Sequence, residues 1–468
     1  METDGQPVFR RHDILSINRY NWQTLRSQPL RELSGALGDL GTLLPLMTAL
    51  TMNHSISLPT TLVFTGLANI ATGVLFGVPL PVQPMKAIAA IAISNRFSKA
   101  ETTASGLIVS AVVGLLSITG LLTWFARVVP IPIVKGIQMG AGLRLVIAAG
   151  SSLLKSLGWI HPSLTDNLIW VIAAFIFLII SSMMVRIPYA LILFIVGLII
   201  AFLHLTLPPD GDYGFHIWHP HVHASFEKET VLTGFYSALA QLPLTVLNSI
   251  IATAHLSSHL LPSIPAPSVH EIGISIAVLN LISCPFGGMP ACHGSGGLAG
   301  QHRFGARSGA SVIVLGLLKL VLGLFVGEGL VDLLQTFPKG LLGIMVIVAG
   351  IELAKVAASL NEGMSDNWQV DQASGRTGLG ESRKAAEYTG SERMERWNVM
   401  LATVAGMLAF GNDAVGFAAG VLWHLGLKGK VRWERWQQQR NAPSIAIRRP
   451  SSPMDRRGER QSLLHSST

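Results

Sequence analysis

The chain has 468 residues, of which 50% are hydrophobic and only 13% are charged, and its mean hydropathy is +0.49. This charged fraction is about half of the roughly 25% usual in globular proteins, which excludes a disordered chain and disfavours an ordinary soluble enzyme. Residues 428–460 supply +7 of the formal net charge of +8, so the composition predicts a membrane protein with a basic tail and without a nucleic-acid-binding face.

Residues 1–32 are polar and carry several arginines, which predicts a cytosolic N-terminal segment without a cleavable signal peptide. Beyond this segment, apolar stretches approach the length of about 20 residues that a helix needs to cross the hydrocarbon core. Twelve candidate spans centre on 33–52, 60–78, 104–126, 131–150, 168–184, 187–206, 231–255, 270–288, 309–327, 338–356, 394–411 and 412–428.

Two further apolar segments, near 83–94 and 292–302, are too short to cross the membrane alone. Each follows a stretch that proline or glycine interrupts, PLPVQP in the first case and GGMPACHGSGG in the second. Sliding the chain by 210 residues sets Gln83 over His293. Interrupted segments at corresponding positions of two halves point to the binding site of a transporter. The alternative, that these residues only kink packed helices, is disfavoured by the paired occurrence.

The order of a helix with polar residues, a plain helix and a broken short helix occurs twice. This order predicts two repeats of seven segments, 33–226 and 227–428, with a polar loop at 357–393 in the second. Because seven is odd, the second repeat is inverted in the membrane. The predicted fold class is therefore an all-α polytopic membrane protein with a seven-plus-seven inverted-repeat transporter fold, in which two broken half-helices meet at mid-membrane.

The distribution of basic residues orients this fold. A cytosolic N-terminus places most arginines between the spans, and the basic tail 429–468, in the cytosol, so both termini are predicted there. The tail contains Glu459, Leu463 and Leu464 in the order of an acidic dileucine sorting signal, which would bind a sorting adaptor. This pattern indicates a vacuolar or other endomembrane location, with the plasma membrane as the alternative.

A helix that begins at mid-membrane presents free N–H groups and the positive end of its dipole to the cavity, and the natural guest of such an end is an anion. Glycines at such a start let the backbone approach the ligand closely. The candidate substrate-binding residues at the two starts are Gln83, Lys86, His293, Gly294, Ser295 and Gly296.

Polar residues also interrupt the first span of each repeat. Asp39 and Thr42 lie one turn apart, and Gln241, Thr245 and Asn248 share one helix face. Because polar residues inside a membrane are costly and usually face an interior cavity, Thr42, Gln241 and Asn248 are predicted to line the anion site. Asp39 is a candidate proton carrier, and the alternative is that it makes a packing hydrogen bond near the membrane edge.

The remaining candidates give no second site. Lys319, in the middle of an apolar span, is expected to snorkel or to pair with Glu352. Alternate histidines, His219, His221 and His223, are more typical of a solvated loop than of a metal site. We predict no metal, no cofactor and no enzymatic activity, because the sequence has no nucleophile–base pair or metal triad.

Several blocks resemble one known family. GALGDLGTLLPL, PLPVQPMKAIAAIAIS, AQLPLTVLNSI and MPACHGSGGLAGQHRFGARSG are similar to the eukaryotic molybdate transporter (MOT1-type) family, a branch of the sulfate-permease superfamily. The resemblance covers about 33–425, and IPIVKGIQMGAGL, FPKGLLGIMVIVAGIELA and GNDAVGF fit its other blocks. One departure is Asp413, which stands where the family usually has a small residue.

The resemblance implies core and gate subdomains and high-affinity uptake of the molybdate anion. The residues themselves favour secondary active transport, and the prediction of proton coupling rests on Asp39 alone. A homodimer in the lipid bilayer is a further expectation. A sulfate transporter is the alternative of the same class, because sulfate and molybdate share charge and shape. An anion channel of the same fold and a membrane receptor with a basic recruiting tail are the alternatives of other classes.

Overall fold

The computed structural model describes residues 13–183, 187–205, 218–223, 227–327, 330–361 and 388–441. The predicted sorting pattern and most of the predicted polar loop lie outside the described residues. The contacts divide the chain into two units, Met1–Trp423 and His424–Thr468, and the helical bundle belongs to the first unit.

The first half of the bundle begins with a helix that precedes the predicted spans, and the spans follow in the predicted order. Its elements are α1 (Ile14–Ser27), α2 (Pro29–Ala36), η1 (Leu37–Asp39), α3 (Leu40–Met52), α4 (Leu58–Phe76), β1 (Val82–Pro84), α5 (Lys86–Asn95), α6 (Lys99–Ile118), α7 (Leu121–Val128), α8 (Ile131–Ala148), η2 (Ala149–Leu154), α9 (Leu168–Met183) and α10 (Tyr189–His204).

The second half repeats this order, with one short strand again ahead of a short helix. Its elements are α11 (Lys228–Leu244), η3 (Thr245–Ala252), α12 (Thr253–Leu260), α13 (Val269–Ser283), η4 (Cys284–Phe286), β2 (Ala291–His293), α14 (Ser295–Arg303), α15 (Ala310–Phe325), α16 (Leu330–Gln335), α17 (Lys339–Lys355), η6 (Val356–Asn361), α19 (Gly390–Phe410) and α20 (Asp413–Asn441).

Within the described residues, every predicted span falls on one or more helical elements. Among the described residues, five helical segments are long and apolar enough to cross a membrane, and α2 to α3 adds a sixth when its bend is counted within one span. Shorter apolar helices, including α5, α9, α10 and α15, complete the bundle. The apolar helices identify an integral multi-pass membrane protein.

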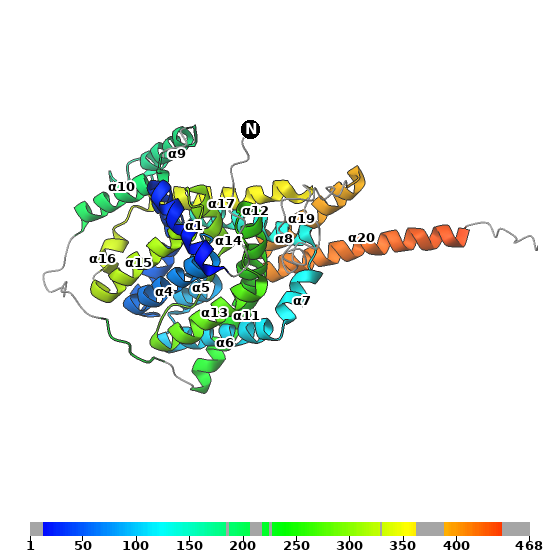
Figure 1. Cartoon of the computed structure of the whole chain (residues 1–468), viewed down its shortest axis with the longest axis horizontal. Coiled ribbons are helices and arrows are strands. Elements are labelled where there is room, and N and C mark those ends of the chain that lie inside the picture. Colours follow the sequence, from blue (N-terminus) through cyan, green and yellow to red (C-terminus); the bar gives the residue numbers. More distant parts are fainter. Residues whose placement is uncertain are drawn as a thin grey trace, which may run out of the picture. The chain divides into compact units, whose positions relative to one another are not determined.

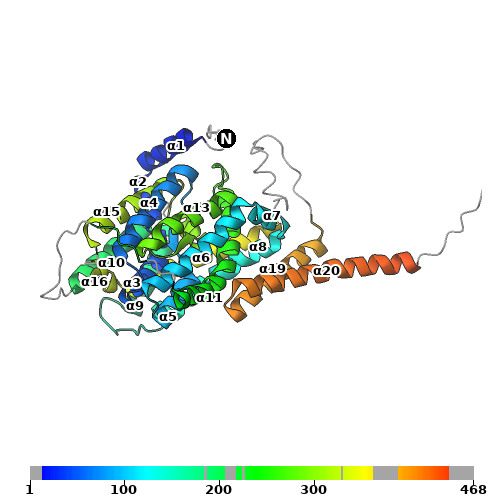
Figure 2. The same cartoon turned by 90° about the horizontal axis from the view of Figure 1, so that it is seen from below.

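Glycines bring the two repeats together. The helices α4 and α15 lie side by side in both views (Figures 1 and 2). Gly66 on α4 packs against the carbonyl oxygen of Gly316 on α15, and Gly316 packs against that of Gly66, so neither position has room for a Cβ. Gly142 on α8 and Gly350 on α17 meet in the same way. Small residues let helix backbones approach closely where no hydrophobic force joins them in lipid.

The structure differs from the prediction in three places. The predicted span 104–126 is two helices, because Gly120 takes a left-handed conformation with φ of 74° between α6 and α7. The segment 1–32 contains α1 and the start of α2. The broken segments are offset by 209 residues and not by 210, since β1 begins at Val82 and β2 at Ala291.

Candidate functional site

The two broken segments meet as a small antiparallel ribbon. Strand β1 pairs with β2 in the register Val82 with His293, Gln83 with Cys292, and Pro84 with Ala291. The next residue along, Met85, extends the pairing through its N–H, which donates to the carbonyl of Pro290 at 2.8 Å. The helices α5 and α14 begin directly after the strands. The ribbon therefore places both helix starts at one site, as the sequence predicted.

Equivalent asparagines hold the two strands in place. The side chain of Asn69 on α4 accepts a hydrogen bond from the N–H of Val82 at 2.7 Å. On α13, Asn280 accepts from the N–H of Ala291 at 2.7 Å and donates to its carbonyl at 2.6 Å. All of these groups are buried, and an unpaired buried backbone group is costly. Sequence analysis missed this pair, although one asparagine in each plain apolar span was its signal.

The start of α5 is capped by a side chain from the other repeat. The Oε1 atom of Gln241 accepts hydrogen bonds from the N–H groups of Ala87 at 2.9 Å and Ile88 at 3.4 Å. Its Nε2 donates to the hydroxyl of Thr245 at 2.9 Å. Gln241 lies at the site as predicted. Its side chain, however, accepts hydrogen bonds from N–H groups of α5 that were expected to bind the anion. At this helix start, the side chain of Lys86 is then the group that can interact with an anion.

The start of α14 is open. In the described chain, the N–H groups of Ser295, Gly296 and Gly297 form the first turn and have no hydrogen-bond partner. The hydroxyl of Ser295 donates to Oδ1 of Asn248 at 2.6 Å, which brings two predicted ligands together. The carboxamide of Gln83 lies so close to Gly294 and Gly297 that a Cβ at either position would overlap it. Glycine here is therefore a packing requirement as well as a way to expose the backbone.

Asp39 connects the first span to the ribbon. Its Oδ1 accepts hydrogen bonds from the hydroxyl of Thr42 at 2.7 Å and from Nε2 of Gln83. Its Oδ2 is buried and has no hydrogen-bond partner among the described residues. The ammonium groups of Lys86 and Lys319 lie within electrostatic range of this carboxylate. The predicted group of Asp39, Thr42 and Gln83 is thus one hydrogen-bonded cluster.

Lys319 does not pair with Glu352, so that prediction is wrong. Its Nζ donates to the carbonyl of Val82 on β1 at 3.4 Å. Glu352 instead lies 3.9 Å from Arg303 and 3.5 Å from Lys355. Lys319 therefore binds the backbone of β1 and stabilises the ribbon. The predicted snorkelling is also absent, because the residue is only 4% exposed.

His293 lies on the other face of the ribbon. Its Nε2 is 3.0 Å from the hydroxyl of Ser275, and its ring meets Phe76 edge-on. Residues paired across two strands share one face and neighbours in a strand alternate, so Cys292 is the residue on the face of Gln83. The thiol of Cys292 accepts a hydrogen bond from the hydroxyl of Ser249 at 3.2 Å. The structure therefore does not bring His293 together with the other predicted ligands.

A charge pair that sequence analysis did not assign lies beside the site. Nη1 of Arg144 on α8 is 2.5 Å from Oδ1 of Asp413, the first residue of α20. The side chain of Asp413 is 1% exposed, and both charges lie within electrostatic range of Lys86. Leu145, next to Arg144, packs directly against Gly296 on the first turn of α14. The signal was the departure of Asp413 from the family pattern, together with one arginine in an apolar span.

The arrangement combines open backbone donors, three nearby cations and two carboxylates. The N–H groups of α14 suit an anion. Among the described residues, no three or more His, Cys, Asp or Glu side chains gather into a group that could hold a metal ion, and the interpretation of the alternate histidines as a solvated loop stays a prediction. Cations and carboxylates nearly balance, so an anion would be held by dipoles and hydrogen bonds more than by net charge. Such a site suits an oxyanion that must be released again.

Comparisons with known proteins agree with this chemistry. A family model described as a molybdate transporter of the MFS superfamily matches residues 31–145 and 234–353. Molybdate transporter 2 of Arabidopsis thaliana is 38% identical over 379 residues, which cover 70% of this chain and 79% of that protein. Molybdate transporter 1 of Chlamydomonas reinhardtii is 31% identical over 440 residues, which cover 69% of this chain and 83% of that protein.

Among solved structures, SLC26A9 matches 89% of this chain and 68% of its own chain, with a TM-score of 0.51 and 13% identity. At this identity the likeness is one of fold. Together with the repeated element order, it confirms the predicted fold class of two inverted repeats with facing half-helices.

Proposed function

The chain belongs to the molybdate transporter family, and from this premise we propose that it moves molybdate across a membrane through the site between α5 and α14. Molybdate is a tetrahedral dianion, and its oxygens accept hydrogen bonds from several directions. The observation that carries the proposal is the unpaired first turn of α14, with Ser295, Gly296 and Gly297 at the meeting point of the two repeats.

The oxyanion would be held by groups from six elements. Backbone donors come from α14, and Asn248 and Gln83 add carboxamides on either side of it. Thr42 lies in the Asp39 cluster, and its hydroxyl reaches the edge of the site. Lys86 and Arg144 supply positive charge to offset the dianion. Gln241 supports the site by capping α5.

Transport would be secondary active and proton-coupled. The buried carboxylate of Asp39 accepts a hydrogen bond from Gln83, and Gln83 contacts the first turn of α14. Protonation of Asp39 would therefore change the interactions at the anion site. The core subdomain, built from α2–α6 and α11–α15, would move against the remaining helices and carry the site between the two faces of the membrane. The contact of Leu145 with Gly296 is one of the contacts that such a movement would break.

The predicted repeats 33–226 and 227–428 and the cytosolic termini remain part of the proposal. The arginines Arg31, Arg303 and Arg307 line one pocket at the ends of three spans, which supports a cytosolic location for that side. Four further points are proposed on the sequence alone. The chain forms a homodimer, its tail binds a sorting adaptor, and its affinity for molybdate is high. Its membrane is vacuolar or another endomembrane, with the plasma membrane as the alternative.

The experiment is uptake of radioactive molybdate into liposomes that contain the purified chain. The test variant is Ser295→Ala, and the matched control is Ser311→Ala, because both serines are buried helix residues whose hydroxyl donates to a carboxamide. We expect Ser295→Ala to raise the half-saturating molybdate concentration by about tenfold, and Ser311→Ala to leave it near the wild-type value. Equal uptake by both variants would contradict the site.

The same liposomes separate the alternatives. Concentrative uptake that depends on a proton gradient supports a coupled transporter, whereas an ohmic current supports a channel. Absence of both supports a receptor. If an excess of sulfate inhibits the uptake of molybdate, the chain is a general oxyanion transporter.

A further inference from the structure

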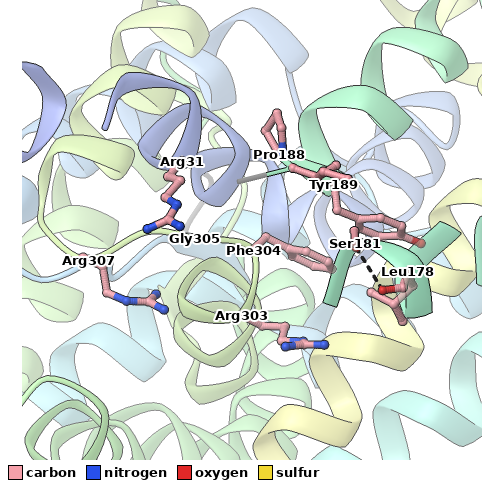
Figure 3. Close-up of a pocket in the computed structure, with 10 residues that line it drawn as sticks. Arg31, Leu178, Ser181, Pro188, Tyr189, Arg303, Phe304, Gly305 and Arg307 are labelled. Carbon is pink, nitrogen blue, oxygen red and sulfur yellow. Dashed lines mark hydrogen bonds between the residues drawn. The ribbon is translucent and has the colours of Figure 1, made fainter. Parts of the chain in front are cut away.

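A separate pocket of about 260 Å³ lies away from the anion site. Figure 3 shows Arg31, Arg303 and Arg307 around it, with the rings of Tyr189 and Phe304 beside them. These two rings stack with centroids 5.7 Å apart. Three of the ten described residues that line the pocket are arginines, and none is acidic. The pocket is therefore strongly basic.

The pocket lies where several membrane helices begin or end. Helix α2 begins at Pro29, α9 ends at Met183, α10 begins at Tyr189 and α14 ends at Arg303. The ends of membrane helices are expected near the boundary between hydrocarbon and water. Basic pockets between membrane helices at the cytosolic boundary are places where anionic lipid headgroups bind.

The backbone that carries the arginines is fixed. The N–H of Arg307 donates to the carboxylate of Glu32 on α2 at 3.1 Å, and the hydroxyl of Ser308 donates to the same oxygen at 3.1 Å. Gly305 takes a φ of 120° and packs against the backbone of Arg31, so a side chain there would be strained. The pocket is thus pre-formed between α2 and the connection from α14 to α15, which lowers the cost of binding.

The guanidinium groups of Arg307 and Arg303 keep donors available for a ligand, whereas that of Arg31 also donates to the side chain of Gln28 at 2.9 Å. Nη1 of Arg307 donates to the carbonyls of His302 and Ala306, and its other N–H groups have no partner in the described chain. Arg303 has one distant carboxylate, 3.9 Å away on Glu352. Burial lowers the pKa of Arg307, the carboxylate of Glu32 opposes this, and the neighbouring charge of Arg31 lowers the pKa further. An anion that bonds several guanidinium groups would relieve this repulsion.

The wall on the side of α9 is apolar and faces outward. Leu178 and Ser181 of α9 line the pocket, and exposed apolar side chains follow the same helix to its end. They are Ile172, Ile176, Ile179, Ile180 and Met183. A surface of this kind on a membrane helix contacts acyl chains. The pocket therefore offers guanidinium groups to a headgroup next to a surface for its hydrocarbon chains.

We propose that this pocket binds the phosphorylated headgroup of an anionic membrane lipid, through Arg31, Arg303 and Arg307. Phosphate oxygens match the fork of N–H donors that arginine presents. Free inorganic phosphate shares this chemistry but lacks the acyl chains that α9 would contact. The lipid would bridge α9 and α10 to α2 and the end of α14, and would therefore stabilise their present arrangement.

The test measures thermal unfolding of the purified full chain in detergent, with a short-chain phosphatidylinositol 4-phosphate as the probe. The variant is Arg31→Gln with Arg303→Gln, which leaves Arg307 in place to hold its loop. The control is Arg127→Gln with Lys155→Gln, which removes the same charge from two exposed positions outside the pocket. We expect the lipid to raise the unfolding midpoint of the wild type and of the control. In the test variant its half-saturating concentration should rise at least about tenfold.

Three results would overturn the proposal. The first is the absence of a midpoint shift with the lipid in the wild type, or an equal shift in the test variant. The second is an equal shift with inorganic phosphate at the same concentration, because the site would then be one for a free oxyanion. The third is loss of the lipid's shift under saturating molybdate, which would place the lipid at the substrate site. Short-chain phosphatidylcholine is the neutral control and should have no effect.

Discussion

Replacing Gln83 with alanine is the most direct perturbation of the anion site. Nε2 of Gln83 donates one hydrogen to Asp39, and its separation of 3.4 Å from the hydroxyl of Thr42 is too long for a good bond. One N–H of this carboxamide is therefore available to the oxyanion, beside the first turn of α14. The substitution removes a single hydrogen bond to a charged ligand.

A hydrogen bond to a charged group contributes about 1.5–3 kcal/mol, which corresponds to about 10- to 150-fold in half-saturating concentration. We expect Gln83→Ala to raise that value for molybdate uptake within this range. The assay is uptake of radioactive molybdate by cells that lack their own transporter, normalised to surface expression. Gln23→Ala, an exposed position on α1, is the matched control.

Wild-type half-saturation and maximal rate in Gln83→Ala, at equal surface expression, would refute the role of Gln83 as a ligand. A lower maximal rate without a change in half-saturation would place Gln83 in the movement between states. In that case its bond with Asp39, and not its contact with the anion, would be the important one.

Three further predictions follow from the same contacts. Asp39→Asn should abolish the stimulation of molybdate uptake by an inward proton gradient while exchange of molybdate without a gradient persists, and uptake that still responds to the gradient would exclude Asp39 as the proton carrier. Asp413→Asn should raise half-saturation by less than Arg144→Gln does, because the first releases the arginine whereas the second removes its charge; equal effects in paired uptake curves would contradict this order. Asn280→Ala should reduce the stability of the bundle by about 1–3 kcal/mol, because the buried N–H and carbonyl of Ala291 lose their partner, and an unchanged thermal unfolding midpoint would show that the ribbon does not need it.

Composition and apolar length were sufficient to predict much of the fold. A helix buried in lipid must be long and apolar, and both properties can be recognised in the local sequence of each span. The two interrupted segments could be predicted for the same reason. Proline and glycine near residues 83 and 294 break a helix through local geometry, whatever the helix packs against. Glycine pairs such as Gly66 with Gly316 were not predicted as contacts, because their partners lie in different repeats.

The partners of the site residues depended on distant packing. Gln241 caps α5 from a position 154 residues further along the chain, and no local pattern records that contact. The face occupied by His293 depended on the register of two strands, in which a shift of one residue exchanges it with Cys292. The pairing of Arg144 with Asp413 joins residues separated by 269 positions.

The sequence by itself was enough to predict that this protein crosses a membrane in two repeats, each with a broken segment that starts a short helix, because apolar length, helix breaks and the charge distribution are local properties. The tertiary structure alone decided that the anion site is asymmetric. Gln241 caps α5, whereas the first turn of α14 keeps its N–H groups free. The physical reason is that a helix dipole exists wherever a helix begins, but whether its donors are available depends on which side chain the fold brings to them.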